Sequence, residues 1–396
     1  MKIMMFLEHK FFKDKNGKLY SEKVITDEIL ERYTSVFGNV TICARGLTKK
    51  PINGILLENP EVDFYPLPNF SFKKIFQNFH FFKQKIKKTA GQYDGFIIRA
   101  PSSISLLAYS AVKRIHKPVM VELVIDPIHF FYEQKKLFYR ILRSVIVKHT
   151  QSMCKKVNAV LYVTKFSLEK RYKSKSMLSK ESDTHFHVAC SDVILKKDNY
   201  FSEIKKHNPG EPFLICHTGW MVGYNKGHKT VINIAKKMNE NGMDTRVYFI
   251  GDGEKKREFE QYAEISGIKD KVVFCGKLQS SEEMNSVMRN CHLFLFPSVN
   301  EGLPRALLEA MANSLPCAAY DTDGIPELLK KNYLAEIGDE ETLFKIAENF
   351  YKNEENRIDY AGKCYRKALE YSFEELNKKR SKFYKEFLRL VIKSSK

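Results

Sequence analysis

The sequence predicts an α/β protein of two domains, each built around a mostly parallel sheet. Short apolar runs alternate with segments of helical periodicity along nearly the whole chain, which is the pattern of repeated strand–helix–strand units. The 396 residues are enough for two or three domains that each bury their own core. A polar segment at 196–211, which contains Asn208-Pro209-Gly210, has the composition of a linker between two halves of similar size.

In the first half, apolar runs and helical patterns follow one another in order. Strands are expected at 3–7, 40–44, 64–65, 95–99, 119–125, 161–164 and 186–189, with helices at 23–37 and 103–115. The first apolar run is interrupted by Glu8-His9-Lys10, so we expect its strand to end at Leu7.

The second half repeats this order. Strands are expected at 213–217, 247–250, 272–274, 293–296 and 317–320, and helices at 230–239, 254–266, 281–289, 304–312 and from 325. The tail from Thr342 onward is helical and charged, and its last helix is expected at 373–392.

The composition excludes several classes of protein. The chain has 29 Phe and 20 Tyr against 19 Gly and 13 Pro, which rules against low-complexity disorder. Charges interrupt every apolar stretch before it reaches the roughly 18 residues of a membrane-spanning helix, and the first run is too short for a secretory signal. The eight cysteines are scattered without a CxxC pair, so we expect a reduced cytoplasmic protein without disulfides or zinc.

The formal net charge of +19 indicates an anionic partner: nucleic acid, a membrane face or a phosphorylated substrate. The excess is concentrated at 61–150, where 15 Lys and Arg stand against 6 Asp and Glu.

Within this basic region, the segment Asn69–Lys88 mixes phenylalanines with six lysines. One side of a helix there would carry Phe72, Ile75, Phe76, Phe79 and Phe82. Such a side is typical either of a stripe that faces the core or of a helix that lies on an anionic membrane. No RNP-like, zinc-finger or helix-turn-helix signature accompanies the charge, so we expect no nucleic-acid partner.

The segment that indicates chemistry runs from Phe294 to Leu329. An apolar strand ends at Pro297, a polar loop follows, and Pro304 suits the first turn of a helix. Ligands of α/β proteins bind at this carboxyl edge of the sheet, and the free N–H groups of a helix start favour a phosphate. Glu301 and Glu309 could face one crevice there, an arrangement that suits a nucleotide sugar. The alternative is that the first carboxylate interacts with the helix dipole and the second is solvated.

The same segment resembles the E-x(7)-E signature of retaining glycosyltransferases of the GT-B fold, family 4. The matching residues are Glu301-Gly302-Leu303-Pro304, Leu308-Glu309-Ala310-Met311-Ala312, Pro316, Gly324 and Pro326-Glu327-Leu328. His217–Gly227 also resembles the family's diphosphate loop. Gly219 lies in its glycine turn, and Lys226-Gly227 match its Lys-Gly pair. Ser372-Phe373-Glu374 resembles the start of the family's closing helix.

The resemblance implies a GT-B fold: two Rossmann-like domains with parallel sheets that face a central cleft. Residues 1–195 would form the acceptor domain, 205–370 the nucleotide-sugar donor domain, and the closing helix at 373–396 would return to the first domain. Family members transfer a sugar with retention of configuration and generally need no metal or cofactor. The nucleotide sugar is then a substrate, with UDP- or GDP-linked donors favoured.

The resemblance also implies roles for single residues. Lys226 would neutralise charge that develops on the leaving diphosphate. Glu309 would accept hydrogen bonds from the ribose, and Glu301 would hold hydroxyls of the transferred sugar. The backbone amides near Gly302 and Leu303 would contact sugar or phosphate. The one D-x-D sequence, Asp321-Thr322-Asp323, lies inside the matched segment, and we interpret it as a turn rather than as a metal site.

Two departures from the family pattern concern the site. Trp220 stands where the family usually has an arginine, so another cation is needed at the diphosphate, and Arg305 is a candidate. In the first domain, the place of a common histidine reads Asp126-Pro127-Ile128-His129. Asp126 or His129 could assist the acceptor hydroxyl, although a structural role is as compatible with His129.

The sequence therefore predicts a metal-independent glycosyltransferase that adds a sugar to a lipid-linked oligosaccharide in surface-polysaccharide assembly. It would act in the cytoplasm, peripherally at the inner membrane face, through Asn69–Lys88. Two alternatives stay open. A nucleotide-sugar epimerase shares the fold, and a catalytically degenerate protein that binds membrane or polyanion would explain Trp220.

Overall fold

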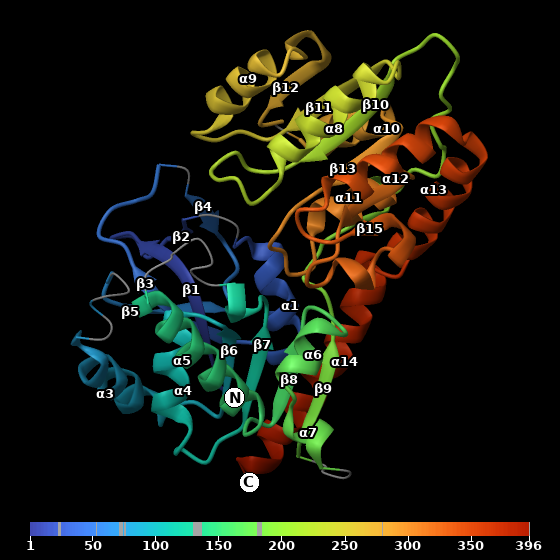
Figure 1. Cartoon of the computed structure of the whole chain (residues 1–396). Coiled ribbons are helices and arrows are strands. Elements are labelled where there is room, and N and C mark those ends of the chain that lie inside the picture. Colours follow the sequence, from blue (N-terminus) through green and yellow to red (C-terminus); the bar gives the residue numbers. More distant parts are fainter. Residues whose placement is uncertain are drawn as a thin grey trace. The chain divides into compact units, whose positions relative to one another are not determined.

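The computed structural model describes residues 1–22, 25–52, 54–70, 74, 77–129, 137–179, 184–278 and 280–395. The chain divides into two units, one of residues 1–190 with 377–396 and one of residues 191–376 (Figure 1). Each unit contains one sheet with helices around it. In the described part of the chain, no helix has both the length and the apolar character needed to cross a membrane.

The first unit is built on seven parallel strands. Their order across the sheet is β5, β3, β1, β6, β7, β8 and β9. Their bounds are β1 Ile3–Lys13, β3 Val40–Gly46, β5 Val62–Leu67, β6 Gly95–Ala100, β7 Val119–Leu123, β8 Ala159–Tyr162 and β9 Phe186–Ala189. Two short antiparallel strands, β2 (Leu19–Ser21) and β4 (Ile55–Leu57), extend the far end of β1. Parallel strands buried on both faces explain why these segments are apolar without alternation.

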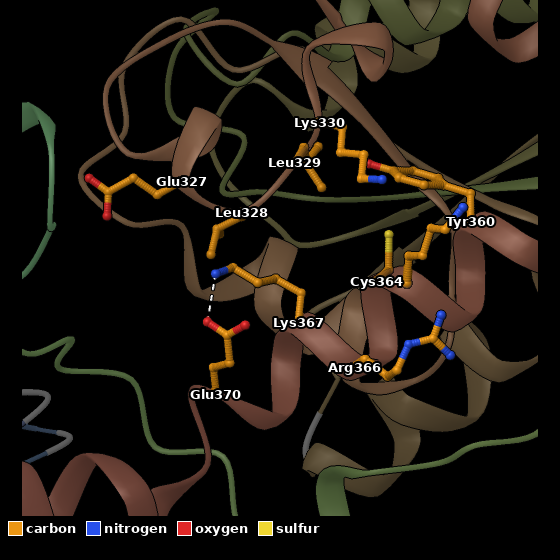
Figure 2. Close-up of a pocket in the computed structure, with 10 residues that line it drawn as sticks. Glu327, Leu328, Leu329, Lys330, Tyr360, Cys364, Arg366, Lys367 and Glu370 are labelled. Carbon is orange, nitrogen blue, oxygen red and sulfur yellow. Dashed lines mark hydrogen bonds and ion pairs between the residues drawn. The ribbon is translucent and has the colours of Figure 1, made fainter.

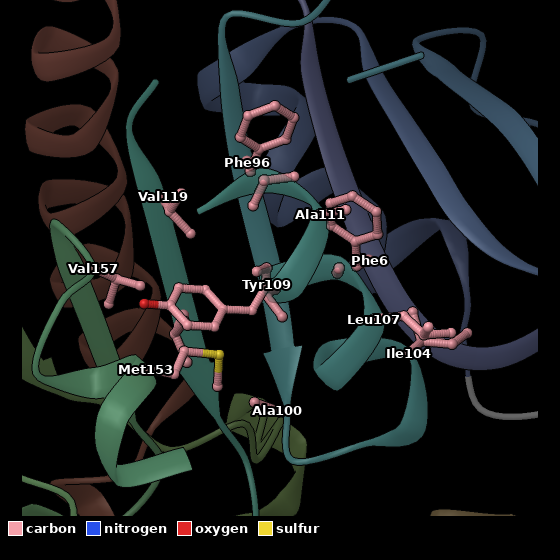
Figure 3. Packing of buried hydrophobic residues seen from close by; sticks show 14 of the residues in the cluster. Phe6, Phe96, Ala100, Ile104, Leu107, Tyr109, Ala111, Val119, Met153 and Val157 are labelled. Carbon is pink, nitrogen blue, oxygen red and sulfur yellow. The ribbon is translucent and has the colours of Figure 1, made fainter. Parts of the chain in front are cut away.

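Helices cover both faces of this sheet. One face carries α3 (Phe79–Ala90), α4 (Ser103–Val112) and α5 (Leu137–Cys154), whose buried residues share a core with Met4 and Phe6 of β1. Figure 3 shows Phe6, Phe96, Leu107 and Met153 within this packing. The other face carries α1 (Asp27–Phe37) and the last part of α14 (Phe373–Ser394).

The second face is joined by aromatic contacts. The rings of Tyr33 and Tyr384 lie 5.3 Å apart, and those of Phe37 and Phe387 lie 6.2 Å apart. These contacts join α1 to α14, although about 350 positions separate the contacting residues in the sequence. The last helix therefore completes the core of the first unit.

The second unit has a fully parallel sheet in the order β12, β11, β10, β13, β14 and β15. The strands are β10 Phe213–Thr218, β11 Thr245–Ile250, β12 Val272–Gly276, β13 Leu293–Phe296, β14 Cys317–Tyr320 and β15 Leu334–Ala335. The helices are α8 His228–Glu240, α9 Lys256–Ile265, α10 Ser281–Arg289, α11 Arg305–Ala312, α12 Glu340–Lys352 and α13 Glu354–Leu369. The order reverses direction at β10, between β11 and β13, which is the place where doubly wound folds bind ligands.

The two Rossmann-like units and their parallel sheets confirm the predicted GT-B fold class. Some elements differ from the sequence-based expectation. β1 runs on to Lys13 instead of ending at Leu7, because β2 and β3 supply hydrogen-bond partners for its polar half. The first helix begins at Asp27, and Lys23 and Val24 lie outside the described residues. The helix α5 was not expected.

Candidate functional site

Three loops at the carboxyl edge of the second sheet are joined by their backbones. The N–H of Gly219 donates to Ile250 O at 3.0 Å, and the N–H of Gly251 donates to Gly276 O at 2.9 Å. Gly251 has φ of +141°, and a Cβ there would lie 2.1 Å from Gly219 O. Only glycine allows this approach, so the loops after β10, β11 and β12 form one continuous floor.

The loop after β10 is also held to the loop that follows the strand β13. The N–H of Val299 donates to Asn225 O at 2.9 Å. Gly227 begins α8 with φ of +80°, and a Cβ there would lie 2.2 Å from Pro297 O. This close approach places Lys226 beside the loop that carries Glu301.

A pocket of about 590 Å³ opens above these loops, and all of its lining residues belong to the second unit. Six residues that the sequence singled out line it: Gly219, Trp220, Lys226, Glu301, Arg305 and Glu309. Gly302 and Leu303 lie in the same loop, between the lining residues Glu301 and Pro304. Residues that stand far apart in the sequence are thus brought to one cavity.

Lys226 and Glu301 form an ion pair in this pocket. Lys226 Nζ donates to Glu301 Oε1 at 2.6 Å, and the hydroxyl of Ser298 donates to the same oxygen at 2.7 Å. The backbone N–H of Glu301 donates to Asp323 Oδ2 at 3.2 Å. The carboxylate is thereby fixed beside the cation through one of its two oxygens.

Asp323 thus has a local structural contact. It has φ of +47°, and its Oδ2 also accepts from the Thr322 hydroxyl at 3.2 Å. These contacts are those of a turn that braces the Glu301 loop. Among the described residues, no group of three His, Cys, Asp or Glu is placed to hold a metal ion. Metal independence itself stays a prediction.

Glu309 is the most buried carboxylate of the pocket. It projects from α11, its side chain is 7 % exposed, and Arg305 Nε donates to its Oε1 at 2.6 Å. Burial raises the pKa of Glu309, and the guanidinium of Arg305 opposes this shift. Arg305 itself is 64 % exposed, so it covers the carboxylate from the open side of the pocket.

The start of α11 also borders the pocket. The helix begins at Arg305, one residue later than expected, and Pro304 is its N-cap without a side-chain capping bond. Its first N–H groups are consequently not capped by that residue, and such groups favour an anion. Gly302 supports the preceding turn, since its carbonyl accepts from the Gly324 N–H at 3.0 Å.

Trp220 lies at the open side of the pocket with 56 % of its surface exposed. It supplies a flat aromatic face to the cavity. Residues that the sequence did not suggest also line the cavity, among them Thr218, Lys277, Ser280 and Met284. The signal for Lys277 was its position directly after Gly276 at the end of a strand, because Gly219 also follows the end of a strand in this sheet.

Two buried histidines lie beneath the loop that carries Lys226. His217 Nδ1 is 2.9 Å from Leu295 O, and the rings of His217 and His228 lie 4.7 Å apart. His228 stacks on Phe259 at 4.7 Å. Burial lowers the pKa of His228 to about 4 and lowers that of His217 well below its usual range. Both rings are therefore neutral at pH 7 and serve as packing beneath the pocket.

The two candidates for the acceptor side lie in the first unit. Asp126 is 3 % exposed and accepts from the N–H of Ile128 at 2.9 Å. It also accepts from the Tyr172 hydroxyl and pairs with Arg171. The carboxylate is thus already engaged in structural contacts. His129 ends the short helix η1 (Pro127–His129), and its side chain lies outside the described part of the structure.

The basic aromatic stretch contributes to the core. Phe82 and Ile86 of α3 are buried in the first unit, and Phe79 packs against the same cluster. Phe72, Ile75 and Phe76 lie outside the described residues, and the described residues Asn69 and Phe70 precede the helix. For the described part, Phe82 and Ile86 face the core, as the first of the two alternatives for this stretch predicts. Membrane contact of Asn69–Lys88 stays a prediction. Phe82 is needed to fill the space between α3 and the sheet.

A second cavity of about 380 Å³ lies in the same unit as the candidate site, between residues 327–330 and α13 (Figure 2). Its rim includes Lys330 and Arg366, while Tyr360 and Cys364 line it from α13. Lys367, also on the rim, pairs with Glu370 at 2.6 Å. None of its lining residues lines the pocket of Lys226 and Glu309, so the two cavities are separate.

Most of the second unit matches a known protein family. Residues 201–367 match the family model described as "Glycosyl transferases group 1". The chain is 26 % identical to Protein CapJ of Staphylococcus aureus, over 98 % of this chain and 97 % of that protein.

Two solved structures are similar in fold. One is the lipopolysaccharide outer core galactosyltransferase WaaB, with a TM-score of 0.65, 14 % identity and 99 % of each chain covered. The other is Anabaena Alr3699/HepE in complex with UDP, with a TM-score of 0.66 and 14 % identity. That similarity covers 96 % of this chain and 98 % of the other.

Proposed function

We propose that this chain is a glycosyltransferase of the GT-B fold that acts in surface-polysaccharide biosynthesis. It transfers a sugar from a nucleotide donor to a saccharide acceptor. Its residues 201–367 match the group 1 family. The single observation that carries the proposal is the arrangement of one pocket. Lys226, Glu301, the start of α11 and Glu309 all border it, and they provide groups suited to phosphate, sugar hydroxyls and ribose. No cofactor is required by this scheme.

The donor we propose is a UDP- or GDP-sugar. Lys226 and the uncapped N–H groups of α11 suit the diphosphate, because both offer positive charge at one side of the cavity. Glu309 can accept from ribose hydroxyls through its second carboxylate oxygen. The structure of HepE is a complex with UDP, which supports a uridine donor for this fold. Arg305 supplies the second cation that Trp220 does not provide.

The chemical step we propose retains the configuration of the transferred sugar and uses no metal. As the glycosidic bond to the diphosphate breaks, negative charge grows on the leaving oxygen, and the ammonium group of Lys226 stabilises it. Lys226 must turn from Glu301 toward the phosphate for this purpose. Glu301 is then free to hold hydroxyls of the sugar.

The acceptor we propose is a lipid-linked oligosaccharide, reached at the inner face of the membrane. The structural neighbour WaaB, a lipopolysaccharide outer core galactosyltransferase, supports a surface-polysaccharide acceptor. The net charge of +19 supports a position at an anionic surface. Asp126 and His129 stay predictions for the acceptor side.

Binding of nucleoside diphosphates tests the donor site. Trp220 is the single tryptophan of the chain and lines the pocket, so its fluorescence reports on binding directly. UDP, GDP, ADP and CDP would be titrated into wild type, Glu309→Ala and the exposed control Glu264→Ala. We expect one nucleotide to bind wild type and the control, and to bind Glu309→Ala at least tenfold more weakly. Equal binding to all three proteins would contradict the site assignment.

Thermal unfolding gives an independent readout. A ligand at 100 times its dissociation constant stabilises the folded state by about 2.7 kcal/mol, which raises the melting temperature by several degrees. The same nucleotide should produce this shift in wild type and in Glu264→Ala only. Once the base is known, product analysis with and without acceptor separates a transferase from an epimerase, because an epimerase converts the donor alone.

A degenerate binding protein is the second candidate, and Trp220 is the observation that favours it. If wild type transfers no sugar and Trp220→Arg restores transfer, this candidate is supported. We expect wild type to be active, because Arg305 already places a guanidinium at the pocket. Trp220→Arg should then tighten the binding of the bare nucleotide without starting a new activity.

A further inference from the structure

The outward side of α5 carries four large apolar side chains. Leu137, Phe138, Ile141 and Val145 are 67 %, 65 %, 56 % and 53 % exposed. Their spacing places them on one face over the first turns of the helix, because residues three and four apart are neighbours on a helix surface. Isolated exposed apolar residues are common, but a continuous row of this kind marks a contact surface.

This row is not a part of the core. Leu142, Ile146 and Met153 of the same helix are buried, and Met153 belongs to the hydrophobic core between α3, α4, α5 and the sheet. The helix is therefore apolar on two sides. Only the inner side has a partner among the described residues, and the outer side faces solvent.

The helices of this layer carry basic side chains and no acidic ones. Arg140, Arg143 and Lys148 lie on α5, and α3 on the same face of the sheet carries Lys83, Lys85, Lys87 and Lys88. No aspartate or glutamate occurs in α3, α4 or α5. Phe81 of α3 is also 61 % exposed. The layer of helices thus combines apolar side chains with positive charge alone.

We infer that this surface, formed by the outer side of α5 and the lysines of α3, docks on an anionic lipid bilayer. The four apolar side chains enter the boundary of headgroups and acyl chains, and the cations contact the lipid phosphates. Each cation near such a surface adds attraction that falls off within a Debye length. The contact helix is therefore α5, and the lysines of Asn69–Lys88 assist it without inserting.

The charge pattern argues against two other occupants. A second copy of this chain on the same face would bring two acid-free basic surfaces together, and like charges repel. A nucleic acid would leave the apolar row without a partner, because phosphate backbones contact cations and not aliphatic side chains. A bilayer satisfies both features of the surface at once.

The inference deepens the proposed lipid-linked acceptor, and its test is separable from that of the donor site. Full-length protein is mixed with sedimenting vesicles of phosphatidylglycerol and phosphatidylethanolamine, or of phosphatidylcholine alone. We expect binding to the anionic vesicles and little to the neutral ones. The variant Phe138→Ser with Ile141→Ser should bind anionic vesicles about tenfold more weakly or worse, because two inserted side chains are lost.

A matched control changes equally exposed apolar residues of the other unit. Ile265→Ser with Ile337→Ser should leave vesicle binding unchanged, since these side chains are 85 % and 50 % exposed on the donor unit. Arg140→Ser with Lys148→Ser should weaken binding and reduce its dependence on salt. Titration of Trp220 fluorescence with nucleotide shows for each variant that the donor unit is folded.

The possible outcomes decide the inference. Unchanged vesicle binding by Phe138→Ser with Ile141→Ser overturns it, whatever the nucleotide result. A wild type that sediments with no vesicle but is dimeric by light scattering, with a monomeric variant, assigns the face to a second copy and also overturns it. Loss of nucleotide binding with intact vesicle binding contradicts the proposed function alone.

Discussion

Lys226 Nζ lies 2.6 Å from Glu301 Oε1, so the cation of the pocket is paired with the carboxylate. Their side chains are 25 % and 12 % exposed, which places the pair at the mouth of the pocket and not in the core. A diphosphate would compete with Glu301 for the ammonium group. Binding of the donor is thus coupled to release of the carboxylate that is proposed to hold the sugar.

Removal of each partner should have a different effect. Lys226→Met should lower turnover about 10²- to 10³-fold, as expected for the loss of one group that stabilises developing charge. Glu301→Gln should also lower turnover, but binding of the bare nucleotide should stay equal or become tighter because Lys226 is released. Steady-state kinetics and fluorescence titration measure the two effects.

The control for Lys226→Met is Lys229→Met on the helix α8. Lys229 pairs with Glu258 at 3.2 Å and does not line the pocket. Turnover of this variant should remain close to that of wild type. Equal losses in both lysine variants would mean that Lys226 acts through general charge and not through its position.

The pair of Arg305 and Glu309 predicts a pH dependence of nucleotide binding. Burial raises the pKa of Glu309, and Arg305 opposes the shift. Ribose hydroxyls donate to the ionised carboxylate, so affinity should fall as pH decreases through the raised pKa. Arg305→Gln removes the opposing charge, and the fall should then begin at a higher pH. The dissociation constant of the nucleotide, measured from about pH 8 to pH 5, checks this.

The effect on stability has the opposite sign. A carboxyl whose pKa is raised in the folded state binds more protons there than in the unfolded chain, so stability falls as pH rises between the two pKa values. The control Arg257→Gln alters an exposed arginine that does not line the pocket. If nucleotide affinity falls over the same pH range in Arg305→Gln as in Arg257→Gln, the coupling between Arg305 and Glu309 is contradicted.

Gly227 should be far less tolerant of a side chain than Gly242. Both have positive φ, +80° and +76°, but a Cβ at Gly227 would lie 2.2 Å from Pro297 O, while nothing lies within 4 Å at Gly242. Gly242→Ala should cost about 1–2 kcal/mol for the left-handed conformation alone. Gly227→Ala should cost clearly more and weaken nucleotide binding, because the loop of Lys226 must shift.

Urea unfolding followed by Trp220 fluorescence gives the free energy of unfolding for both glycine variants. The difference between them isolates the steric contact with Pro297, since the backbone penalty is common to both. If Gly227→Ala proves no less stable than Gly242→Ala, the loop is not held against Pro297 in the way described.

The sequence was most informative where one pattern determined one structure. Alternating apolar runs and helical segments predicted the parallel sheets, and the spacing of Glu301 and Glu309 placed both at one pocket. The ion pair between Lys226 and Glu301 was not predictable, because the two residues lie 75 positions apart. Contacts between the two loops bring them together, namely the packing of Gly227 on Pro297 and the hydrogen bond from Val299 to Asn225.

Helices with two apolar sides were predicted least well. In α5, Leu142 and Ile146 face inward while Phe138 and Ile141 face outward, so the segment has no single apolar stripe from which a helix could be recognised. The place of Phe82 stayed open for a related reason, because a basic aromatic helix shows the same pattern whether its phenylalanines contact a core or a membrane. The continuation of β1 to Lys13 depended on partner strands far along the chain.

The buried histidines predict how the donor unit responds to acid. Burial lowers the pKa of His228 to about 4, whereas an unfolded histidine has a pKa near 6.5. Between these values the unfolded chain binds more protons than the folded one, so stability is fully present above about pH 6.5 and is lost as pH falls toward 4. His217 adds to this loss, because its pKa is also lowered by burial.

His228→Phe keeps an aromatic ring against Phe259 and removes one titrating group, so its free energy of unfolding should decline less steeply with acid. Urea unfolding at several pH values, read by Trp220, measures the slope, and the exposed His80→Gln serves as the control. A slope in His228→Phe equal to that of wild type would show that this ring is not neutral and buried beneath the loop of Lys226.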